Sequence, residues 1–153
     1  MVIERIIKES FAVVGKEGST SDGEGFIQKL WKDANSNFKE IVQLAKKDQN
    51  GKLVGIWGAM SDFSRSFKPW DGFNKGLYLA GAECNKDVQA PEGWTKWVIP
   101  GYEYLRVQCE DNDTFRNMLK YMEENKIELA GAVHDFTDPE TGNNYMCFPI
   151  RKL

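Results

Sequence analysis

The sequence is poor in residues that hold metals or perform nucleophilic catalysis. It contains one histidine, His134, and three cysteines among its 153 residues. Cys84, Cys109 and Cys147 lie far apart and form no C-x-x-C pair, whereas a zinc site needs several ligands at suitable spacing. A G-x-S-x-G nucleophile motif is also missing, so triad hydrolysis is disfavoured. We therefore expect no metal and no other cofactor.

A basic stripe and a long apolar run are missing too. The 20 basic and 23 acidic residues are interspersed and sum to a net charge of −3, which argues against nucleic-acid binding by this chain. The first ten residues, MVIERIIKES, lack the apolar core of a signal peptide. An odd number of scattered cysteines is typical of a reducing compartment. We expect a cytoplasmic protein without membrane contact.

The order of apolar patterns and breakers predicts a mixed α and β chain. The glycine-rich stretch 15–25, GKEGSTSDGEG, matches neither phosphate-binding glycine motif, so we interpret it as a loop. Helical spacing of apolar residues predicts helices at 26–47 and 111–125. Alternating or β-branched runs predict strands at 2–16, 52–62, 76–84 and 94–110, with a bend at Pro100-Gly101, and a closing hairpin over 129–153.

The second half of the chain echoes the first. LVGIWGAMSD (53–62) aligns with LAGAVHDFTD (129–138), and each copy precedes a strand with tyrosine at its third position, Tyr78 and Tyr145. Two tandem β-α-β-β units, approximately 1–88 and 89–153, explain this pattern. We predict an α+β fold in one domain, 1–153: an antiparallel sheet with both helices on one side and a ligand cleft at the seam between the units.

Glu83 is the exceptional residue of the strand predicted at 76–84. It stands in the apolar run GLYLAGAEC, and a carboxylate is costly to bury without a partner. Three explanations remain open: the strand end is wet, a ligand meets the acid, or a structural partner such as Arg106 or a lysine does. The ligand explanation requires that Glu83 has no permanent counter-charge within the protein.

Two further groups of residues have an open interpretation. The segment 63–73 carries Phe63, Phe67, Trp70 and Phe73 in an irregular stretch, so it either lines a cavity or folds down as a lid. His134 lies close in sequence to Asp135 and Asp138. An acid–base pair is one interpretation of that arrangement, although a single histidine of this kind is more often exposed.

Order and spacing over both halves resemble a known family. The strand GLYLAGAEC, the connector PEGW, the strand IPGYEYLRV and the closing CFPIRK are similar to GyrI-like, or AraC-type, effector-binding domains. That domain is the ligand-sensing part of bacterial multidrug-responsive transcription activators. The resemblance implies a cleft between the two units in which a solvent-shielded glutamate among aromatic rings receives lipophilic cations.

The resemblance assigns two site residues, Glu83 for the acid and Tyr104 for the tyrosine that follows the Ile-Pro dipeptide. Many relatives also carry an acid shortly before the proline of the last strand, but this sequence reads YMCFP at 145–149. To the two implied residues we add aromatic side chains near the seam that could stack on a flat cation: Trp57, Trp70, Phe73, Trp97 and Tyr102.

The primary hypothesis is a stand-alone module that binds amphipathic, cationic small molecules, as a sensor with a separate regulator protein or as a sequestering protein. Its oligomeric state would be a monomer or a homodimer. The resemblance also implies an alternative, a hydrolase of strained cyclopropane-containing electrophiles in which Glu83 directs water. Inhibition of DNA gyrase is a third, weaker alternative.

Overall fold

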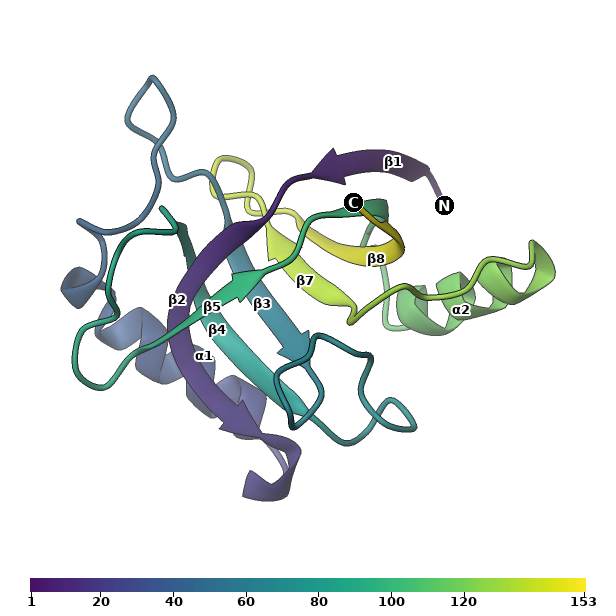
Figure 1. Ribbon diagram of the computed structural model, residues 1–153, viewed down its shortest axis with the longest axis horizontal. Coiled ribbons are helices and arrows are strands. Elements are labelled where there is room, and N and C mark those ends of the chain that lie inside the picture. Colours follow the sequence, from purple (N-terminus) through teal and green to yellow (C-terminus); the bar gives the residue numbers. More distant parts are fainter.

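The structure is a computed structural model that describes residues 1–153 (Figure 1). It contains eight strands and two α-helices, which confirms the α+β class. The strands are β1 (Ile3–Lys8), β2 (Phe11–Ser19), β3 (Ile56–Ser61), β4 (Leu77–Cys84), β5 (Thr95–Ile99), β6 (Tyr102–Gln108), β7 (His134–Thr137) and β8 (Asn144–Lys152). The helices are α1 (Phe26–Ser36) and α2 (Thr114–Glu124), with short 3₁₀ turns at Thr20–Asp22 and Phe38–Glu40.

All eight strands belong to one antiparallel sheet in the order β1-β6-β8-β7-β3-β4-β2-β5. The chain order repeats β-β-α-β-β, so the predicted duplication is confirmed and each unit has one additional strand at its start. These first strands are exchanged between the units, because β1 pairs with β6 and β5 pairs with β2. β3 pairs with β7 at the seam.

Four predicted elements have different bounds from those expected. β2 continues to Ser19, so the first five residues of the stretch 15–25, which was interpreted as a loop, belong to the sheet. The stretches 2–16 and 94–110 each contain two strands, because the chain turns at Glu9-Ser10 and at Pro100-Gly101 and continues at a different position in the sheet. The helix predicted over 26–47 ends at Ser36. Asn37 departs from helical geometry and its side chain donates to the Asp33 carbonyl, after which a 3₁₀ turn carries the remaining apolar residues onto the sheet.

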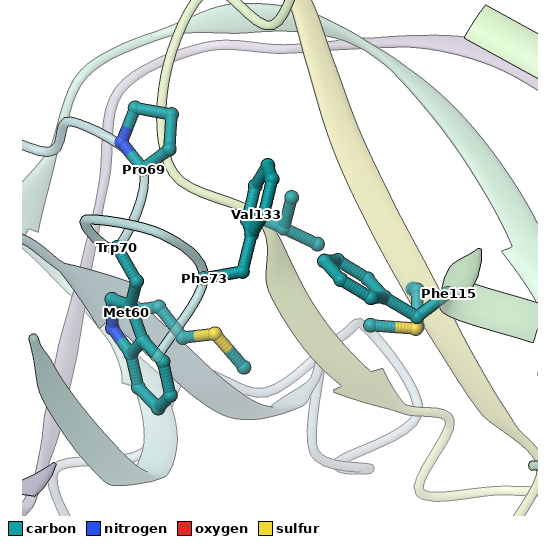
Figure 2. Close-up of a pocket in the computed structure, with 7 residues that line it drawn as sticks. Met60, Pro69, Trp70, Phe73, Phe115 and Val133 are labelled. Atoms are coloured by element: carbon teal, nitrogen blue, oxygen red, sulfur yellow. The ribbon is translucent and has the colours of Figure 1, made fainter. Parts of the chain in front are cut away.

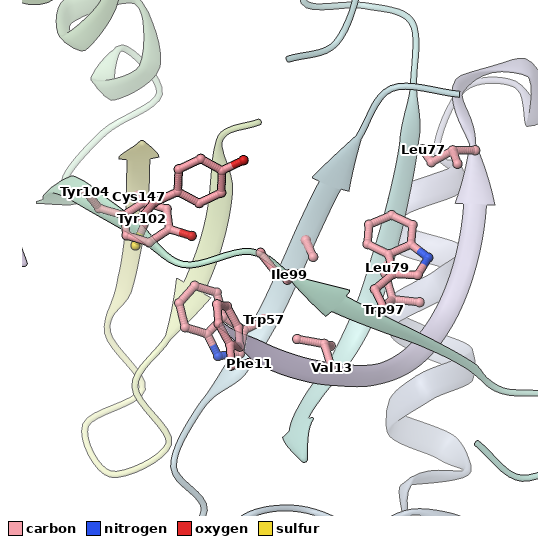
Figure 3. Packing of buried hydrophobic residues seen from close by; sticks show 11 residues of the cluster. Phe11, Val13, Trp57, Leu77, Leu79, Trp97, Ile99, Tyr102, Tyr104 and Cys147 are labelled. Atoms are coloured by element: carbon pink, nitrogen blue, oxygen red, sulfur yellow. The ribbon is translucent and has the colours of Figure 1, made fainter. Parts of the chain in front are cut away.

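The sheet is strongly curled. Only two residues separate β1 from β2, although these strands hold the first and seventh positions in the sheet order. The edges of the sheet must therefore approach each other, and one face becomes an interior. Figure 3 shows the buried cluster on this interior face, which includes Phe11, Val13, Trp57, Leu79, Trp97, Ile99, Tyr102 and Tyr104.

The opposite face of the sheet, here called the helix face, carries both helices, as predicted. Helix α1 packs on β2 and β4 around Val14 and Ala80, and α2 packs on β6 and β8 around Leu105 and Phe148. Between the helices the seam runs along β3 and β7. None of the helices has the length and apolar character that crossing a bilayer requires.

The aromatic segment between β3 and β4 has a fixed anchor. Asp62 accepts hydrogen bonds from the backbone N–H groups of Ser66 and Lys68. Desolvation opposes the charge of Asp62, but hydrogen bonds from Ser64 and its neighbours outweigh it and lower its pKa to about 2. Phe67 packs against Trp97 in the interior, whereas the residues after Phe67 cross to the helix face.

Candidate ligand-binding site

Glu83 is fully enclosed at the end of β4 and has a counter-charge within the protein. Its carboxylate lies 3.1 and 3.2 Å from the Lys8 ammonium nitrogen and accepts a 3.1 Å hydrogen bond from the Trp57 indole N–H. The ammonium group also lies 4.5 Å from the centre of the Phe11 ring. The expectation that Glu83 lacks a permanent protein partner is therefore wrong, and the alternative of a structural lysine is confirmed.

Four other predicted site residues share the interior with Glu83. Trp57, Trp97, Tyr102 and Tyr104 are all buried, and their rings pack together with aliphatic side chains (Figure 3). The Trp97 indole N–H donates to Glu17, whereas the Tyr104 hydroxyl has no hydrogen-bond partner. These four predicted residues lie together, but they form a packed core.

A small cavity of about 220 Å³ opens beside Glu83 at the rim of the interior. Ile6, Trp57 and Phe136 supply apolar walls, and both Lys8 and Arg106 reach it. Both protein cations at this cavity are paired, Lys8 with Glu83 and Arg106 with Glu4. The cavity therefore offers no unpaired acid to the cationic ligand that was expected here.

His134 and Asp135 do not form an acid–base pair. Adjacent residues of a strand point to opposite faces, and His134 faces the interior while Asp135 faces the seam on the helix face. His134 is completely buried rather than exposed, and its Nδ1 accepts a hydrogen bond from the Met60 backbone N–H. Burial lowers the pKa of His134 to about 3, so the imidazole is neutral.

The larger cavity lies at the seam on the helix face, where the duplication was expected to leave a cleft. This seam cavity has a volume of about 620 Å³, within the range of roughly 300–1,000 Å³ that is usual for small-molecule sites. Its walls come from α1, from both seam strands, from β4, from the residue after β6 and from the start of β8: Trp31, Asn35, Ile56, Tyr78, Cys109, Asp135, Thr137, Asn144 and Tyr145.

Asp135 is the acid of the seam cavity, and it forms no salt bridge. Its carboxylate accepts a 3.1 Å hydrogen bond from the Tyr78 hydroxyl, which itself accepts one of 3.1 Å from the Trp31 indole N–H. Desolvation raises the pKa of Asp135 to about 6, although the hydrogen bond from Tyr78 lowers it. The side chain is half-buried, so a charged carboxylate without a counter-ion faces the cavity at neutral pH.

The position of Tyr78 depends on a glycine. Tyr78 stands on β4, and its side chain passes over β3 at Gly58 to reach Asp135 on β7. A Cβ atom at Gly58 would lie 1.8 Å from the Tyr78 hydroxyl oxygen. Only glycine at this position lets the tyrosine cross the seam.

The two remaining predicted residues, Trp70 and Phe73, lie on the helix face and not in the interior. They line a separate cavity of about 190 Å³ whose walls are all apolar (Figure 2). Met60 of β3 and Met146 of β8 line it from the sheet, and Phe115 comes from α2. Phe73 packs edge-on against Phe115, with ring centres 5.4 Å apart.

Sequence reasoning missed Asp135 as the acid that faces the seam cavity. The available signal was the alternation along 133–137, which places Asp135 on the face opposite His134, together with the seam position that the repeat assigns to this strand. Pairing the acid with the neighbouring histidine obscured that signal. The structure brings no three histidine, cysteine or acidic side chains together in a group that could hold a metal ion.

The curled sheet with two helices on one face and a polar cavity at its seam defines an effector-binding class of domain. Residues 5–133 match the family described as integron-associated effector binding protein (Cass2), and the chain belongs to that family. The predicted GyrI-like assignment is thereby confirmed, and with it the binding of a small-molecule effector as the class function.

Solved structures with low sequence identity share this fold. SAV2435 bound to tetraphenylphosphonium has a TM-score of 0.70 at 12% identity, over 99% of this chain and 94% of that chain. The EcmrR C-terminal domain has a TM-score of 0.63 at 17% identity over the whole of both chains. The integron cassette protein VCH_CASS2 of Vibrio cholerae has a TM-score of 0.58 at 13% identity, over 97% and 95%. No curated protein matches the sequence.

Proposed function

We propose that the protein binds amphipathic organic cations in the seam cavity and that Asp135 supplies the negative charge. The observation that carries this proposal is the half-buried Asp135 carboxylate, which has a hydrogen-bond donor but no cationic partner. Coulomb attraction to a ligand cation is stronger here than in bulk water, because the surroundings of the carboxylate are partly desolvated. Glu83, by contrast, already holds Lys8.

The walls of the seam cavity suit the same kind of ligand. Trp31 and Tyr78 present aromatic rings beside the acid, and a cation over an aromatic face gains about 0.5–2 kcal/mol per ring. The tetraphenylphosphonium bound to SAV2435 is a lipophilic cation, which supports this class of ligand for a chain of the same fold. Flat aromatic walls accept varied shapes, so we expect several cations to bind.

Tetraphenylphosphonium is therefore a suitable first probe. Isothermal titration at pH 8 would compare the wild type with Asp135→Asn and with the matched variant Glu83→Gln. We expect Asp135→Asn to lose about 1–3 kcal/mol of binding free energy, as for removal of a charged partner, and Glu83→Gln to bind like the wild type. Neutral triphenylphosphine oxide should not distinguish the variants. Loss of binding in Glu83→Gln alone would instead assign the ligand to the interior.

The hydrolase alternative depends on Glu83 acting on water. Both of its carboxylate oxygens accept hydrogen bonds from Lys8 or Trp57, so a catalytic water molecule would have to share this acid with two protein donors. Incubation with an electrophilic cyclopropane compound followed by product analysis tests this alternative. Turnover that disappears in Glu83→Gln would establish catalysis. As a binding module, the protein would act as a sensor with a separate regulator or by sequestering its ligand.

A further inference from the structure

Tyr78 separates two cavities on the helix face. Its side chain spans the seam, held at one end by the β4 backbone and at the other by the hydrogen bond to Asp135. The seam cavity lies on one side of the Tyr78 side chain and the apolar cavity on the other.

The strand register shows that the cavities are neighbours. Alternate residues of a strand share a face, so one row of positions on each seam strand passes from the seam cavity, under Tyr78, into the apolar cavity. On β3 this row is Ile56, Gly58 and Met60, and on the β7 side it is Thr137, Asp135 and Val133. The first and last members of each row line different cavities and are only four residues apart.

The two cavities differ in chemistry. The seam cavity contains the charged Asp135, whereas the walls of the apolar cavity carry no polar side chain. An apolar cavity of about 150 Å³ in another protein stays dry and accepts benzene, and this one measures about 190 Å³. It therefore has room for one phenyl ring or a short alkyl chain, but not for a hydrated ion.

We propose that the two cavities form one bipartite site, in which a cationic head meets Asp135 and an apolar arm enters the Met60–Phe115 cavity after Tyr78 swings aside. This inference rests on the proposed function and specifies its ligand as a cation with a projecting aromatic or alkyl arm. Tyr78 is then the residue that determines specificity. Compact cations leave it bonded to Asp135, and arm-bearing cations displace it.

The test uses three trimethylammonium probes with the same charge: tetramethylammonium, benzyltrimethylammonium and (3-phenylpropyl)trimethylammonium. We expect the longest probe to bind wild type at least about 10-fold more tightly than the compact one, because burying a phenyl group contributes roughly that much. Val133→Phe fills the apolar cavity and should abolish this ratio while the compact probe keeps its affinity.

Two variants test whether the Tyr78 side chain separates the two cavities. Tyr78→Phe removes the hydroxyl that binds Asp135, and Gly58→Ala places a methyl group where that hydroxyl lies. Both should increase the ratio of long-probe to compact-probe affinity and accelerate association of the long probe. Thermal unfolding checks that each variant is folded, and Tyr78→Phe serves alone if Gly58→Ala is not.

The outcomes separate the two proposals. If no probe binds in an Asp135-dependent way, the proposed function fails. If all three probes bind with equal affinity, or if Val133→Phe leaves the affinity ratio unchanged, the site is not bipartite and the function at Asp135 stands alone. If Tyr78→Phe does not alter the ratio of long-probe to compact-probe affinity, the Tyr78 side chain does not control access to the apolar cavity.

Discussion

Lys8 and Glu83 form a salt bridge between β1 and β4, with 3.1 Å between the ammonium nitrogen and Oε1, although 75 positions separate them. The ammonium group lies 4.5 Å from the Phe11 ring centre and 5.7 Å from that of Trp57. An acid with two aromatic rings is the arrangement expected of a receptor for an organic cation. In this protein a lysine of the same chain occupies it.

Removing either partner of this pair should have unequal effects on stability. The Glu83 side chain is 2% exposed and that of Lys8 is 24% exposed. In Lys8→Met the carboxylate stays buried with only the Trp57 hydrogen bond, so we expect a loss of about 2–3 kcal/mol at pH 8. In Glu83→Gln the lysine can turn toward water and Trp57 keeps an amide oxygen as acceptor, so the loss should be about 1 kcal/mol or less.

Urea unfolding at pH 8 measures both effects. Equal losses in the two variants, or a larger loss in Glu83→Gln than in Lys8→Met, would contradict this account of the pair.

The kinds of residue that fill the interior were predictable, but the partner of Glu83 was not. Alternation along 76–84 identified Glu83 as a costly buried acid, and the resemblance placed aromatic rings beside it. The identity of its partner depends on the exchange of β1 between the units, which brings residue 8 to the far end of β4. A contact between strands that are distant in sequence leaves no periodic signal in either strand.

The affinity of the seam cavity for cations should depend on pH. Asp135 has a pKa of about 6, and only its charged form attracts a cation. Affinity should therefore be constant above about pH 7 and fall as the pH drops through 6, approaching a tenfold loss per pH unit below it. Tyr78 and Cys109 face the same carboxylate, and burial raises the pKa of both, so neither titrates in this range.

Titration calorimetry with tetraphenylphosphonium between pH 5 and 8 measures that dependence. Asp135→Asn provides the matched control, because its weaker binding should not vary with pH. Tetraphenylphosphonium itself does not titrate, so any pH dependence belongs to the protein. Equal affinity for the wild type at pH 5 and pH 8 would show that Asp135 does not carry the ligand charge.

The stability of the protein in acid should depend on two groups whose protonation has opposite effects on the free energy of unfolding. His134 has a folded pKa of about 3, below its ordinary value of 6.5, so its contribution is present above pH 6.5 and is lost as the pH falls toward 3. Asp135 has a folded pKa of about 6, above its ordinary value of 3.8. Its contribution is present below pH 3.8 and is lost as the pH rises through 6.

The two contributions oppose each other between pH 6 and 4, so the wild type should lose stability slowly there. Asp135→Asn removes the contribution of the acid. We expect this variant to lose about 1 kcal/mol more per pH unit than the wild type in that range, as a slope of one proton requires. Urea unfolding at pH 7, 6, 5 and 4 measures both profiles. Parallel profiles for the two proteins would refute the assignment.

The seam shows why the sequence did not single out Asp135 as an acid that faces a cavity. The repeat predicted that β3 and β7 lie in corresponding places, and this was sufficient to locate a cleft between the units. Glu83 stands out because its neighbours are apolar, whereas Asp135 follows His134 and was interpreted as a possible partner of that histidine. Its exposure to the cavity depends on Gly58 and Tyr78, which belong to two other strands.

Tyr104 allows the interior and the seam cavity to be distinguished as ligand sites. The resemblance assigned this tyrosine to the ligand, but its buried hydroxyl has no hydrogen-bond partner, and burial raises its pKa well above the usual range. A buried hydroxyl without a partner destabilises a fold by about 1–3 kcal/mol. Tyr104→Phe should therefore leave the protein equally stable or more stable, and cation affinity should not change.

The matched replacement Tyr78→Phe removes a hydroxyl that has two partners, so it should change the binding of arm-bearing cations. If Tyr104→Phe weakens cation binding while Tyr78→Phe does not, the ligand occupies the interior and Lys8 must leave Glu83 to admit it.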